Sequence, residues 1–454
     1  MTALSAVFKA YDVRGIVPDQ LDARACRAIG WAFAGFAGTD RIVVGRDMRS
    51  SGEELASAFA DGVRAVGAGV VDIGLVSTDL LYFASGLLQA PGAMFTASHN
   101  PAGYNGIKMC LAGAAPISQD TGLAAIRDAA QQALATDADA GPARGGLERQ
   151  DLLGAYADHV RSFVDVKALA PLRVVADTAN GMGGLVAPAV FDGLPFDVTV
   201  LYEELDGTFP NHPADPIQPE NLVDLKKAVL EHGADIGLAF DGDADRVFLV
   251  DERAEPVSGS LTTALVARAM LAKHPGATVL YNLICSKVVP ETIEECGGTA
   301  VRTRVGHSFI KQVMAETGAV FGGEHSGHYY FSENFRADSG LIAALVVLEV
   351  LSAAGRPLSE LLEPLRRYAD SGEVNTEVAD PAAAVDALSA HYAAQGADTD
   401  RTDGLTVDFG SWWFNLRPSN TEPLLRLNVE AADATACEAR VAEVLALVDR
   451  LAAS

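Results

Sequence analysis

Three copies of one short pattern limit the possible folds of this chain more than any other property. The copies begin at Arg41 (RIVVGRDMRSSGEELASAFADGVRAVGAGVVDIG), Leu172 (LRVVADTANGMGGLVAPAVFDGLPFDVTVLY) and Ala277 (ATVLYNLICSKVVPETIEECGGTAVRTR). Each has a short strand rich in β-branched residues, a polar or glycine-rich turn, a helical stretch, and a second strand after another turn. A β-turn-α-turn-β unit of this kind predicts a mixed, mostly parallel sheet covered by helices. We therefore expect an α/β fold that contains three related α/β domains.

Turn-rich stretches predict where these domains end. ATDADAGPARGG at 135–146 follows the first unit, and DERAEPVSGS at 251–260 closes the second. After about residue 367, helical segments alternate with strands such as LTVDFG and LLRLNVE, which predicts a smaller α+β domain. The expected domains are residues 1–143, 144–253, 254–366 and 367–454.

Composition narrows the class of protein. With 454 residues the chain is too long for one core, and 49% hydrophobic with 21% charged residues is typical of a folded globular protein. The longest apolar run, LIAALVVL at 341–348, is far short of the ~20 residues of a membrane span. The five cysteines are scattered without CxxC spacing, so we expect neither a disulfide framework nor a structural zinc site. Unpaired cysteines fit a reducing compartment, and we therefore expect a cytoplasmic location.

The net charge of −26 constrains the ligands of this protein. Nucleic-acid binding needs a basic surface, so we expect none. An anionic substrate would be repelled by the chain as a whole. Its site would therefore need a local cluster of Arg, Lys or a bound cation.

The segment TASHNPAGYNGIK places Ser98 in a turn directly after an apolar run that ends at Phe95. Ser98 is either a turn residue or a nucleophile held at the end of a strand. We do not expect His99 to be its base, because side chains of adjacent residues diverge, and the GxSxG elbow of hydrolases is absent. Lys108 lies beyond a tight turn and could return to the serine as a cation. A hydroxyl beside a lysine suits phosphoryl transfer, which needs charge neutralisation, better than acyl transfer.

Three aspartates alternate after the next apolar strand, in DIGLAFDGDADRVFLVD: Asp241, Asp243 and Asp245. An EF-hand does not fit, since Arg246 replaces the loop glycine and both flanks are strand-like. A solvated acidic turn is one interpretation. The other is a Mg²⁺ or Ca²⁺ site, because three packed carboxylates are costly without a cation and Mg²⁺ serves phosphoryl chemistry. Arg246 would lie beside the ion, free to hold a substrate oxygen or a phosphate.

GGEHSGHYYF at 322–331 gathers polar side chains, among them Glu324 and Ser326, between glycines. They offer the donors and acceptors that neighbouring sugar hydroxyls need, although a plain glycine-rich turn is an alternative. Upstream, RVGHSFI contributes His307, which is either a structural histidine or part of a site.

The segment NLRPSNTEP near the C-terminus carries a guanidinium, two hydroxyls and an amide within five residues. They belong to Arg417, Ser419, Asn420 and Thr421. Such a set suits the several oxygens of a phosphate, which arginine can bind bidentately. Ser419 and Glu422 also match a helix capping box, but the alternating LLRLNVE that follows predicts a strand.

The four segments together predict a reaction. A serine, a three-carboxylate loop, a loop suited to hydroxyls and a phosphate clamp lie on separate parts of the chain. KAYDVRG near the N-terminus adds positive charge, from Lys9 and Arg14, close to a predicted first strand. We expect an enzyme that phosphorylates or dephosphorylates a sugar that already carries another phosphate.

TASHNP, DGDADR, GEHSGH and RPSNTEP, in this order and with these separations, resemble the motifs of the α-D-phosphohexomutase superfamily, most closely its bacterial phosphomannomutase/phosphoglucomutase branch. The likeness runs from KAYDVRG to LLRLNVE. It implies three related α/β domains and a smaller C-terminal domain around a central cleft. It also implies a phosphoserine at Ser98, with Mg²⁺ joining it to the aspartates.

The resemblance implies a role for each candidate residue. The metal ligands would be Ser98, Asp241, Asp243 and Asp245. Proton transfer or charge stabilisation at the reacting oxygen would fall to Arg14, Lys108 and His307. Glu324 and Ser326 would hold the O3 and O4 of the sugar, and we expect Tyr11 and Arg246 to be further substrate-binding residues. The phosphate that does not react would be bound by Arg417, Ser419, Asn420 and Thr421.

The implied reaction consists of two phosphoryl transfers. Phosphoserine 98 gives its phosphoryl group to the free hydroxyl of a hexose monophosphate, which makes a hexose 1,6-bisphosphate. The bisphosphate turns over in the cleft, and its other phosphate returns to Ser98.

Three short sequence features bear on which sugar is the substrate. GEQSGH loops in the family accompany glucosamine phosphate, whereas His or Met after the glutamate accompanies mannose and glucose phosphates, so His325 favours the latter. GTFPNHPADPIQPENL at 207–222 resembles the bacterial phosphomannomutase version. Some dual-specificity members carry a basic residue just before the cysteine of the third-domain turn, but here Ile284 precedes Cys285, and Lys287 lies two residues beyond. We expect mannose 1- and 6-phosphate as substrates.

Alternatives remain at this stage. A phosphoglucomutase, a dual-specificity enzyme or a phosphoglucosamine mutase would differ only in loop contacts. A non-catalytic sugar-phosphate binder is a different class, and the intact Ser98, aspartates and Lys108 argue against it. A serine hydrolase is the weakest alternative because no triad spacing is visible.

Overall fold

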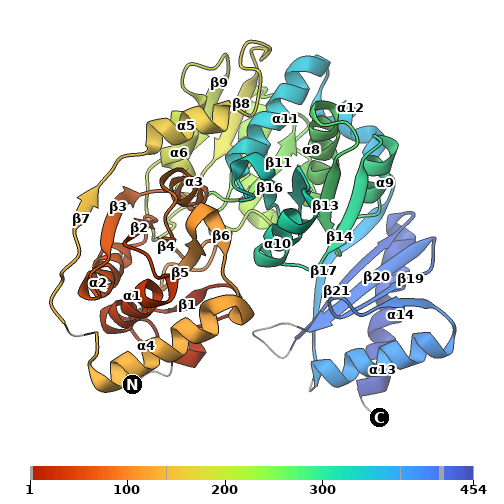
Figure 1. Ribbon diagram of the computed structural model, residues 1–454. Helices are drawn as coiled ribbons and strands as arrows, with labels where there is room; N and C mark the ends of the chain where they lie inside the picture. Colours follow the sequence, from red (N-terminus) through yellow and green to blue (C-terminus); the bar gives the residue numbers. More distant parts are fainter. Residues whose placement is uncertain (1–3, 140, 379, 419–423, 453–454) are drawn as a thin grey trace.

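The computed structural model describes residues 4–139, 141–378, 380–418 and 424–452. These residues form four β-sheets with covering helices, which we name units I to IV in chain order. Units I, II and III follow one another in an arc, and unit IV lies beside unit III at the end of the arc (Figure 1).

Unit I is built on a seven-stranded sheet of order β1-β5-β4-β2-β3-β7, with β6 paired to β5. Its strands are β1 (Val13–Ile16), β2 (Arg41–Arg46), β3 (Gly69–Leu75), β4 (Gly92–Phe95), β5 (Tyr104–Leu111), β6 (Ala115–Pro116) and β7 (Leu147–Arg149). Its helices are α1 (Ala23–Ala37), α2 (Gly52–Ala65), α3 (Thr78–Leu88) and α4 (Ala124–Thr136). Ile42 and Val44 pack into the core on one face of the sheet and Val43 into the core on the other. An apolar run in β2 follows from this two-sided burial.

Unit II has the strand order β12-β11-β10-β8-β9, and unit III the order β14-β13-β15-β16. The elements of unit II are α5 (Leu153–Arg161), β8 (Arg173–Asp177), α6 (Gly183–Phe191), β9 (Asp197–Leu201), α7 (Val223–His232), β10 (Ile236–Phe240), β11 (Val247–Asp251) and β12 (Pro256–Val257). Those of unit III are α8 (Gly259–Lys273), β13 (Thr278–Asn282), α9 (Val288–Glu295), β14 (Thr299–Thr303), α10 (His307–Thr317), β15 (Phe321–Gly323), β16 (Tyr329–Phe331), α11 (Gly340–Ala354) and α12 (Leu358–Leu362).

The three repeated patterns form the same substructure. In each, the first two strands are parallel neighbours: β2 and β3, β8 and β9, β13 and β14. A third strand, β4, β10 or β15, lies parallel on the other side of the first. A fourth, β5, β11 or β16, then runs antiparallel to the third. The predicted α/β fold with three related units and mixed sheets is confirmed.

Unit IV is different: its sheet, of order β17-β21-β20-β19-β18, is antiparallel throughout. Its elements are β17 (Ala369–Glu377), α13 (Pro381–Ala394), β18 (Asp398–Asp400), β19 (Leu405–Asp408), β20 (Trp412–Pro418), β21 (Leu424–Ala431) and α14 (Ala434–Ala452). This is the smaller α+β unit that the sequence predicts.

Two short strands extend the sheets beyond the predicted domain ends. β7 pairs with β3 in unit I, past the predicted end at residue 143. β12 pairs with β11 inside 251–260, which the sequence presents as a linker. Both strands have at most three residues and lack an apolar run, so their pairing depends on the neighbouring strand and not on their own composition.

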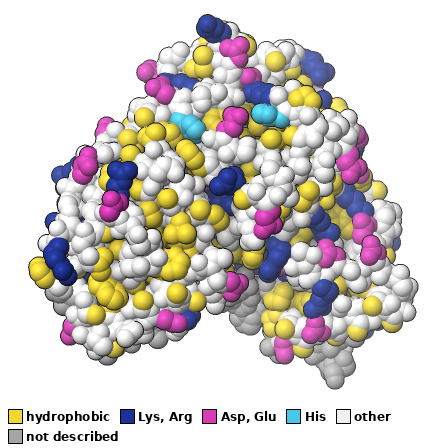
Figure 2. Space-filling model, in the orientation of Figure 1, with side chains coloured by type: hydrophobic (Ala, Val, Ile, Leu, Met, Phe, Trp, Pro, Cys, Tyr) yellow, Lys and Arg dark blue, Asp and Glu magenta, His cyan; other side chains and the backbone are white. Residues whose placement is uncertain are grey.

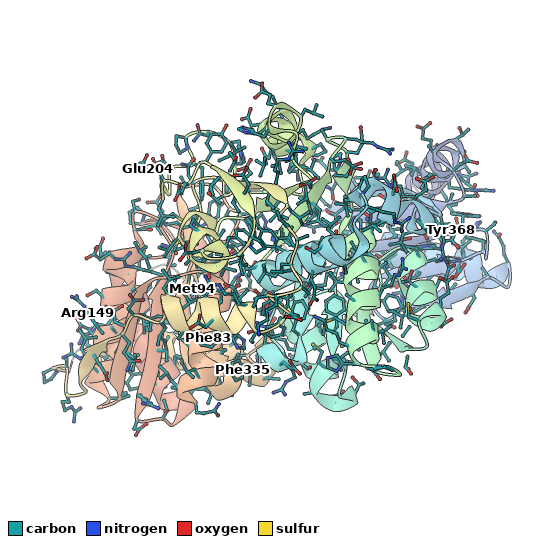
Figure 3. All side chains as sticks on the ribbon, turned by 90° about the horizontal axis from the view of Figure 1, so that it is seen from above. Phe83, Met94, Arg149, Glu204, Phe335 and Tyr368 are labelled. Carbon is teal, nitrogen blue, oxygen red and sulfur yellow. The ribbon has the colours of Figure 1, made fainter. Side chains whose placement is uncertain are left out.

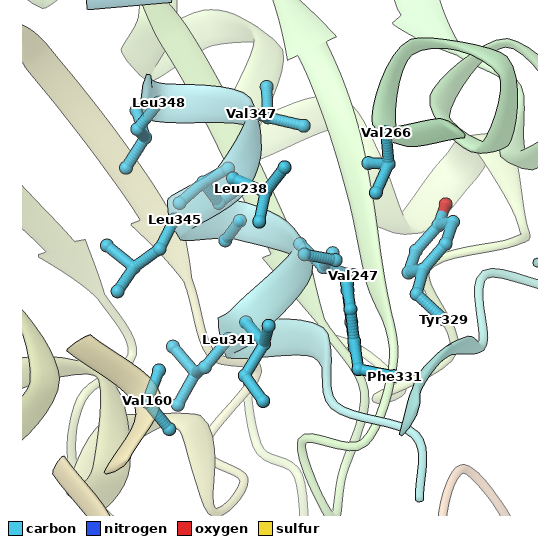
Figure 4. Close-up of a cluster of buried hydrophobic side chains, with 14 of the residues drawn as sticks. Val160, Leu238, Val247, Val266, Tyr329, Phe331, Leu341, Leu345, Val347 and Leu348 are labelled. Carbon is cyan, nitrogen blue, oxygen red and sulfur yellow. The ribbon is translucent and has the colours of Figure 1, made fainter. Parts of the chain in front are cut away.

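One continuous hydrophobic core joins units I, II and III. At its centre lies α11, whose residues Gly340 to Leu348 are all buried. A helix that is apolar all round needs such surroundings. Figure 4 shows α11 among side chains of α5 (Val160), β10 (Leu238) and β11 (Val247). Phe83 of α3 and Phe335, which follows β16, both pack against the ring of His159 on α5, where units I, II and III meet (Figure 3).

Unit IV has a core of its own, formed by residues between Ala369 and Val448. The space-filling view shows the molecule hollowed between unit I and unit IV (Figure 2). Within the described ranges, no single helix has the length and apolar composition to cross a membrane; α11 together with Leu358–Leu365 meets that test only as a pair bent by 97°.

Candidate active site

Three of the four predicted motifs occupy equivalent places in their sheets. Each lies in the turn that joins two antiparallel neighbours: β4 to β5, β10 to β11 and β15 to β16. Of the fourth motif, Arg417 lies at the end of β20, and residues 419–423 lie outside the described residues. The first three turns come at the carboxyl ends of strands that are parallel to their other neighbour, where ligands bind in open α/β sheets. The internal repeat thus brings three of the motifs to corresponding edges.

Ser98 is buried in its turn and contacts the aspartate loop of unit II. Its Oγ donates to Asp241 Oδ2 at 2.8 Å, and its backbone N–H donates to Thr96 Oγ1 at 2.9 Å. Its φ of 50° is unusual for a residue with a side chain, and such conformations cluster at functional sites. A Cβ on Gly242 would lie 2.5 Å from the Ser98 carbonyl oxygen, so only glycine allows the two loops to pack this closely.

The three aspartates form a buried cluster that is neutralised in part by two basic side chains. Asp241, Asp243 and Asp245 are at most 1% exposed. Lys108 Nζ lies 2.7 Å from Asp243 Oδ2 and 2.6 Å from Asp245 Oδ2, and Arg246 Nε lies 2.9 Å from Asp241 Oδ2. Three carboxylates thus face two cations, which leaves one negative charge without a counter-charge among these groups.

Burial and charge act in opposite directions on these carboxylates. Burial raises the pKa of Asp241 to about 7 even beside Arg246. Burial would also raise the pKa of Asp243, but the ammonium of Lys108 holds it below its ordinary value. A cation at the cluster would favour the ionised form of all three side chains.

The cluster fits a divalent metal ion. One oxygen of each aspartate lies within 4.8 Å of the others. Asp243 Oδ1 and Asp245 Oδ1 are buried without a hydrogen-bond partner in the part of the chain that the structure describes. Buried carboxylate oxygens of this kind are the ligands that hard divalent cations take.

Arg246 and His99 are arranged differently from the sequence-based expectation. Arg246 is not free, because it holds Asp241 and its Nη2 donates to His99 Nδ1 at 2.7 Å. The expectation that the His99 side chain diverges from Ser98 is wrong: Nδ1 lies 3.3 Å from Ser98 Oγ, since the left-handed turn at Ser98 brings the ring back. Burial, with Arg246 beside it, lowers the pKa of His99, and its Nδ1 lone pair accepts from Arg246.

Arg14, on strand β1, lies against the turn that carries Ser98. Its Nη1 donates to Asn100 Oδ1 at 2.5 Å and its Nη2 pairs with Asp12 at 2.6 Å. β1 is the neighbour of β5, so the sheet itself brings Arg14 beside the turn that carries Ser98.

A second group of candidates gathers where units I and III meet. The Tyr11 hydroxyl donates to the Val305 carbonyl at 3.3 Å, and its ring lies 5.4 Å from that of His307. The Gly306 N–H donates to Glu324 Oε1 at 3.1 Å, which joins the start of α10 to the β15–β16 turn. Ser326 is half-buried in the same turn. The structure thus places Tyr11, His307 and Glu324 together.

The unit IV candidates are described only in part. Arg417 is 8% exposed, and its Nη2 donates to Glu373 Oε2 at 2.6 Å. Its Nη1 is buried and has no hydrogen-bond partner among the described residues. Ser419, Asn420 and Thr421 lie outside the described residues.

Two site residues escaped the sequence analysis. Arg49, buried after β2, donates to the carbonyl oxygens of Ser98 and Asn100 at 2.8 and 2.6 Å and holds the serine turn in place. Thr78, the first residue of α3, donates through Oγ1 to Asp243 Oδ2. Arg49 follows a strand of the repeated pattern, a signal that could have pointed to it, whereas nothing in the local sequence marks Thr78.

A cavity of about 830 Å³ lies elsewhere, along β2, β3 and β7, and none of the predicted site residues lines it. Its three arginines lie within 4 Å of carboxylates: Arg46 with Glu53, Arg64 with Asp61, and Arg149 with Asp72. It therefore has no excess positive charge for an anionic ligand.

Comparison with known proteins identifies the family of the chain. Four family models match in order, described as phosphoglucomutase/phosphomannomutase alpha/beta/alpha domains I, II and III and C-terminal domain. They match residues 5–136, 154–255, 258–368 and 373–447.

Relatives match along almost the full chain. A protein of Xanthomonas campestris named "phosphohexose mutases" is 44% identical over 96% of this chain and 98% of its own. A phosphomannomutase of Salmonella montevideo is 41% identical over 97% of this chain and 98% of its own.

A solved structure of a phosphoglucomutase/phosphomannomutase family protein from Burkholderia thailandensis superposes with a TM-score of 0.89. It is 33% identical, and the match covers 100% of this chain and 98% of that one. The chain therefore belongs to the phosphoglucomutase/phosphomannomutase family and is a mutase of the isomerase class.

Proposed function

We propose that this enzyme is a phosphomannomutase, which interconverts mannose 6-phosphate and mannose 1-phosphate through phosphoserine 98 and a hexose 1,6-bisphosphate. The observation that carries the proposal is the hydrogen bond from Ser98 Oγ to Asp241 in a buried cluster of three carboxylates. A serine held at a divalent-cation site suits phosphoryl transfer. Relatives from Salmonella and Escherichia coli named phosphomannomutase, 39–41% identical over nearly the whole chain, support it.

We propose Mg²⁺ as the ion, held by Asp241, Asp243 and Asp245 together with the Ser98 phosphoryl group. When bound, the ion supplies positive charge to the phosphoryl oxygens. Lys108, whose pKa is raised by Asp243 and Asp245 against the effect of burial, keeps its positive charge beside the reacting group.

The first transfer breaks the bond between Ser98 Oγ and phosphorus and forms a bond from phosphorus to the free hydroxyl of the hexose phosphate. The hydroxyl loses its proton to a base, and the departing Ser98 Oγ takes up a proton and becomes the hydroxyl that donates to Asp241. We assign His307 as the base, because burial keeps its pKa well below the ordinary value, so that the ring is neutral and can accept a proton, and its Nδ1 has no partner in the described structure. The reverse set of bonds returns the other phosphate to Ser98, so the net reaction is an isomerisation.

The ends of the substrate would be held by different units. Glu324 and Ser326 on unit III, with Tyr11, are proposed to bind the sugar hydroxyls. Arg417 on unit IV, with Ser419, Asn420 and Thr421, is proposed to bind the phosphate that does not react. Arg417 Nη1 is buried and has no hydrogen-bond partner among the described residues, which supports this assignment, since a phosphate oxygen would satisfy it. Arg246 is proposed to reach the substrate only after it leaves His99 or Asp241.

Mannose is preferred over glucose in this proposal because Lys287 is engaged elsewhere. Its Nζ donates to Asp408 Oδ1 at 2.7 Å and to the Gly410 carbonyl at 3.0 Å. It therefore does not replace the basic residue that some dual-specificity relatives carry before the cysteine. A dual or glucose-directed mutase is the second candidate, since both sugars share the contacts described here. All five cysteines are unpaired, which supports the proposed cytoplasmic location.

A coupled assay with Mg²⁺ and a trace of hexose 1,6-bisphosphate tests the proposal. Mannose 1-phosphate, glucose 1-phosphate and glucosamine 1-phosphate are compared at equal concentration. We expect the highest kcat/KM for mannose 1-phosphate. Equal values for mannose and glucose would establish a dual enzyme instead, and no turnover of any sugar would leave a non-catalytic binder.

A further inference from the structure

Thr78 lies outside the family motifs, yet it makes two hydrogen bonds to the aspartate loop. Its Oγ1 donates to Asp243 Oδ2 at 2.5 Å, and its backbone N–H donates to the Asp243 carbonyl oxygen at 3.0 Å. Thr78 is fully buried and belongs to unit I, whereas Asp243 belongs to unit II. The contact therefore crosses between two units at the metal site.

These bonds decide which oxygen of Asp243 is free. Oδ2 accepts from both Thr78 and Lys108, and Oδ1 has no partner in the described part of the chain. With one oxygen held from two sides, the carboxylate cannot rotate without losing buried hydrogen bonds. Oδ1 is thereby presented to an ion at the cluster.

The position of Thr78 is itself held by buried contacts from other units. The next residue, Asp79, accepts from the hydroxyls of Ser77, Tyr156 and Ser339. Tyr156 lies on α5, and Ser339 caps α11 through its hydrogen bond with Ile342. A shift of the first turn of α3 would break this set of bonds. These bonds therefore hold Thr78 in place, and Thr78 in turn holds the aspartate loop.

We propose that Thr78 is a positioning residue of the metal centre, which holds Asp243 so that its Oδ1 faces the divalent ion. Partners behind a metal ligand typically change metal affinity about 10- to 100-fold when they are removed. The α3 N-terminus adds a favourable field for the negative charge, since α3 is 11 residues long and begins at Thr78. The inference rests on the proposed function in one respect, that the ion binds at the three aspartates.

The test measures metal binding directly, by titration of the full-length enzyme with MnCl₂ followed by electron paramagnetic resonance and with MgCl₂ by calorimetry. Thr78→Val keeps the shape of the side chain and removes only the hydroxyl, and Thr78→Ser restores a hydroxyl. Thr292→Val is the matched control, because Thr292 is also buried but its Oγ1 has no hydrogen-bond partner in the described structure.

We expect Thr78→Val to weaken Mn²⁺ binding at least about 10-fold, Thr78→Ser to recover most of it, and Thr292→Val to bind as the wild type does. Thr78→Ala, measured in the same way, replaces Thr78→Val if the valine variant does not fold. Wild-type Mn²⁺ affinity in the folded Thr78 variants would overturn the inference alone. Absence of Mn²⁺ binding by the wild-type enzyme would overturn both the inference and the metal centre of the proposed function. The titration of the wild-type enzyme distinguishes this outcome from the first.

Discussion

Units I to III and unit IV are held in the molecule in different ways. The first three share one hydrophobic core that contains residues from Val43 to Leu365, with α11 at its centre. Unit IV keeps a separate core. Burial of apolar surface is the main stabilising term in folding, so the first three units are expected to behave as one body.

Polar side chains join unit III to unit IV, whose hydrophobic cores are separate. Lys287 pairs with Asp408 at 2.7 Å and Arg302 with Asp400 at 3.2 Å, and the side chains of both pairs are 24–45% exposed. The Lys287 N–H also donates to Glu430 Oε1 at 3.0 Å. Exposed ion pairs contribute only about 0–1 kcal/mol each.

Under the proposed function, the phosphoryl transfer takes place in units I to III and the phosphate that does not react is bound by unit IV. Ser98, the aspartates and Lys108 lie in the units that share one core, and they contact one another without a substrate. Arg417 lies on the unit that is attached by weak polar contacts, as a closing element of the site would need. Substitutions in units I to III and substitutions in unit IV should therefore have different effects on the kinetics, and the following predictions test that difference.

Ser98→Ala should have the largest effect and reduce turnover to the background of the assay, since no phosphoryl carrier remains. The coupled assay measures it, and circular dichroism checks that the fold is retained. KM cannot be determined for a variant without turnover. Binding of mannose 1-phosphate should persist, because unit IV is unchanged. Turnover near the wild-type rate would remove Ser98 from the mechanism.

Arg417→Ala should act mainly on KM. It removes a charge-assisted contact to the phosphate, worth about 1.5–3 kcal/mol, which corresponds to roughly a 10- to 150-fold change. Steady-state kinetics on mannose 1-phosphate measures the effect, with Arg401→Ala as a control. Arg401 lies in the same unit but is half-exposed and pairs with Asp386. An unchanged KM for Arg417→Ala would contradict the phosphate clamp.

Lys287→Ala should loosen the contact between units III and IV with a small energetic cost, about 0.2–1 kcal/mol. Hydrogen exchange of peptides from α9 and β19 should become faster, and kcat/KM should change by less than about five-fold. Asp386→Asn removes an exposed pair within unit IV and should leave the α9 exchange unchanged. If the two variants gave the same exchange pattern, Lys287 would not contribute to the attachment of unit IV.

His212→Gln, a substitution in unit II, should slightly change how the stability of the folded protein depends on pH. His212 Nε2 lies 3.0 Å from Asp177 Oδ2 and Nδ1 lies 2.9 Å from the Pro213 carbonyl, so both nitrogens face acceptors. Burial lowers the pKa of His212, but the Asp177 hydrogen bond outweighs it and the net pKa is raised. The stabilisation is present below the unfolded pKa of about 6.5 and is lost as the pH rises through the folded value.

Melting temperatures between pH 6 and pH 9 provide the measurement for His212. The wild type should lose more stability over this range than His212→Gln. His232→Gln serves as the control, because His232 is exposed at the end of α7. Parallel curves for the wild type and His212→Gln would show that the pair is not ionised in the folded protein.

The sequence alone determined the repeated unit and the location of its motifs. β-Branched runs, glycine turns and helical stretches are local signals, and they predicted β2, β8 and β13 with their parallel partners. The same local patterns placed the serine and aspartate motifs at strand ends. The short pairings β7 and β12 were missed because two or three residues carry no pattern of their own.

Only the tertiary structure decided which of these residues meet and what each one faces. Ser98 and Asp241 are 143 positions apart, and Thr78 and Asp243 are 165 apart, so their contacts depend on how the shared core orients units I and II. The same packing turned Arg246 toward His99 instead of leaving it free. Local sequence specifies a strand and its turn, but the direction of a buried polar side chain is set by the nearest partner that satisfies it, and that partner usually comes from elsewhere in the chain.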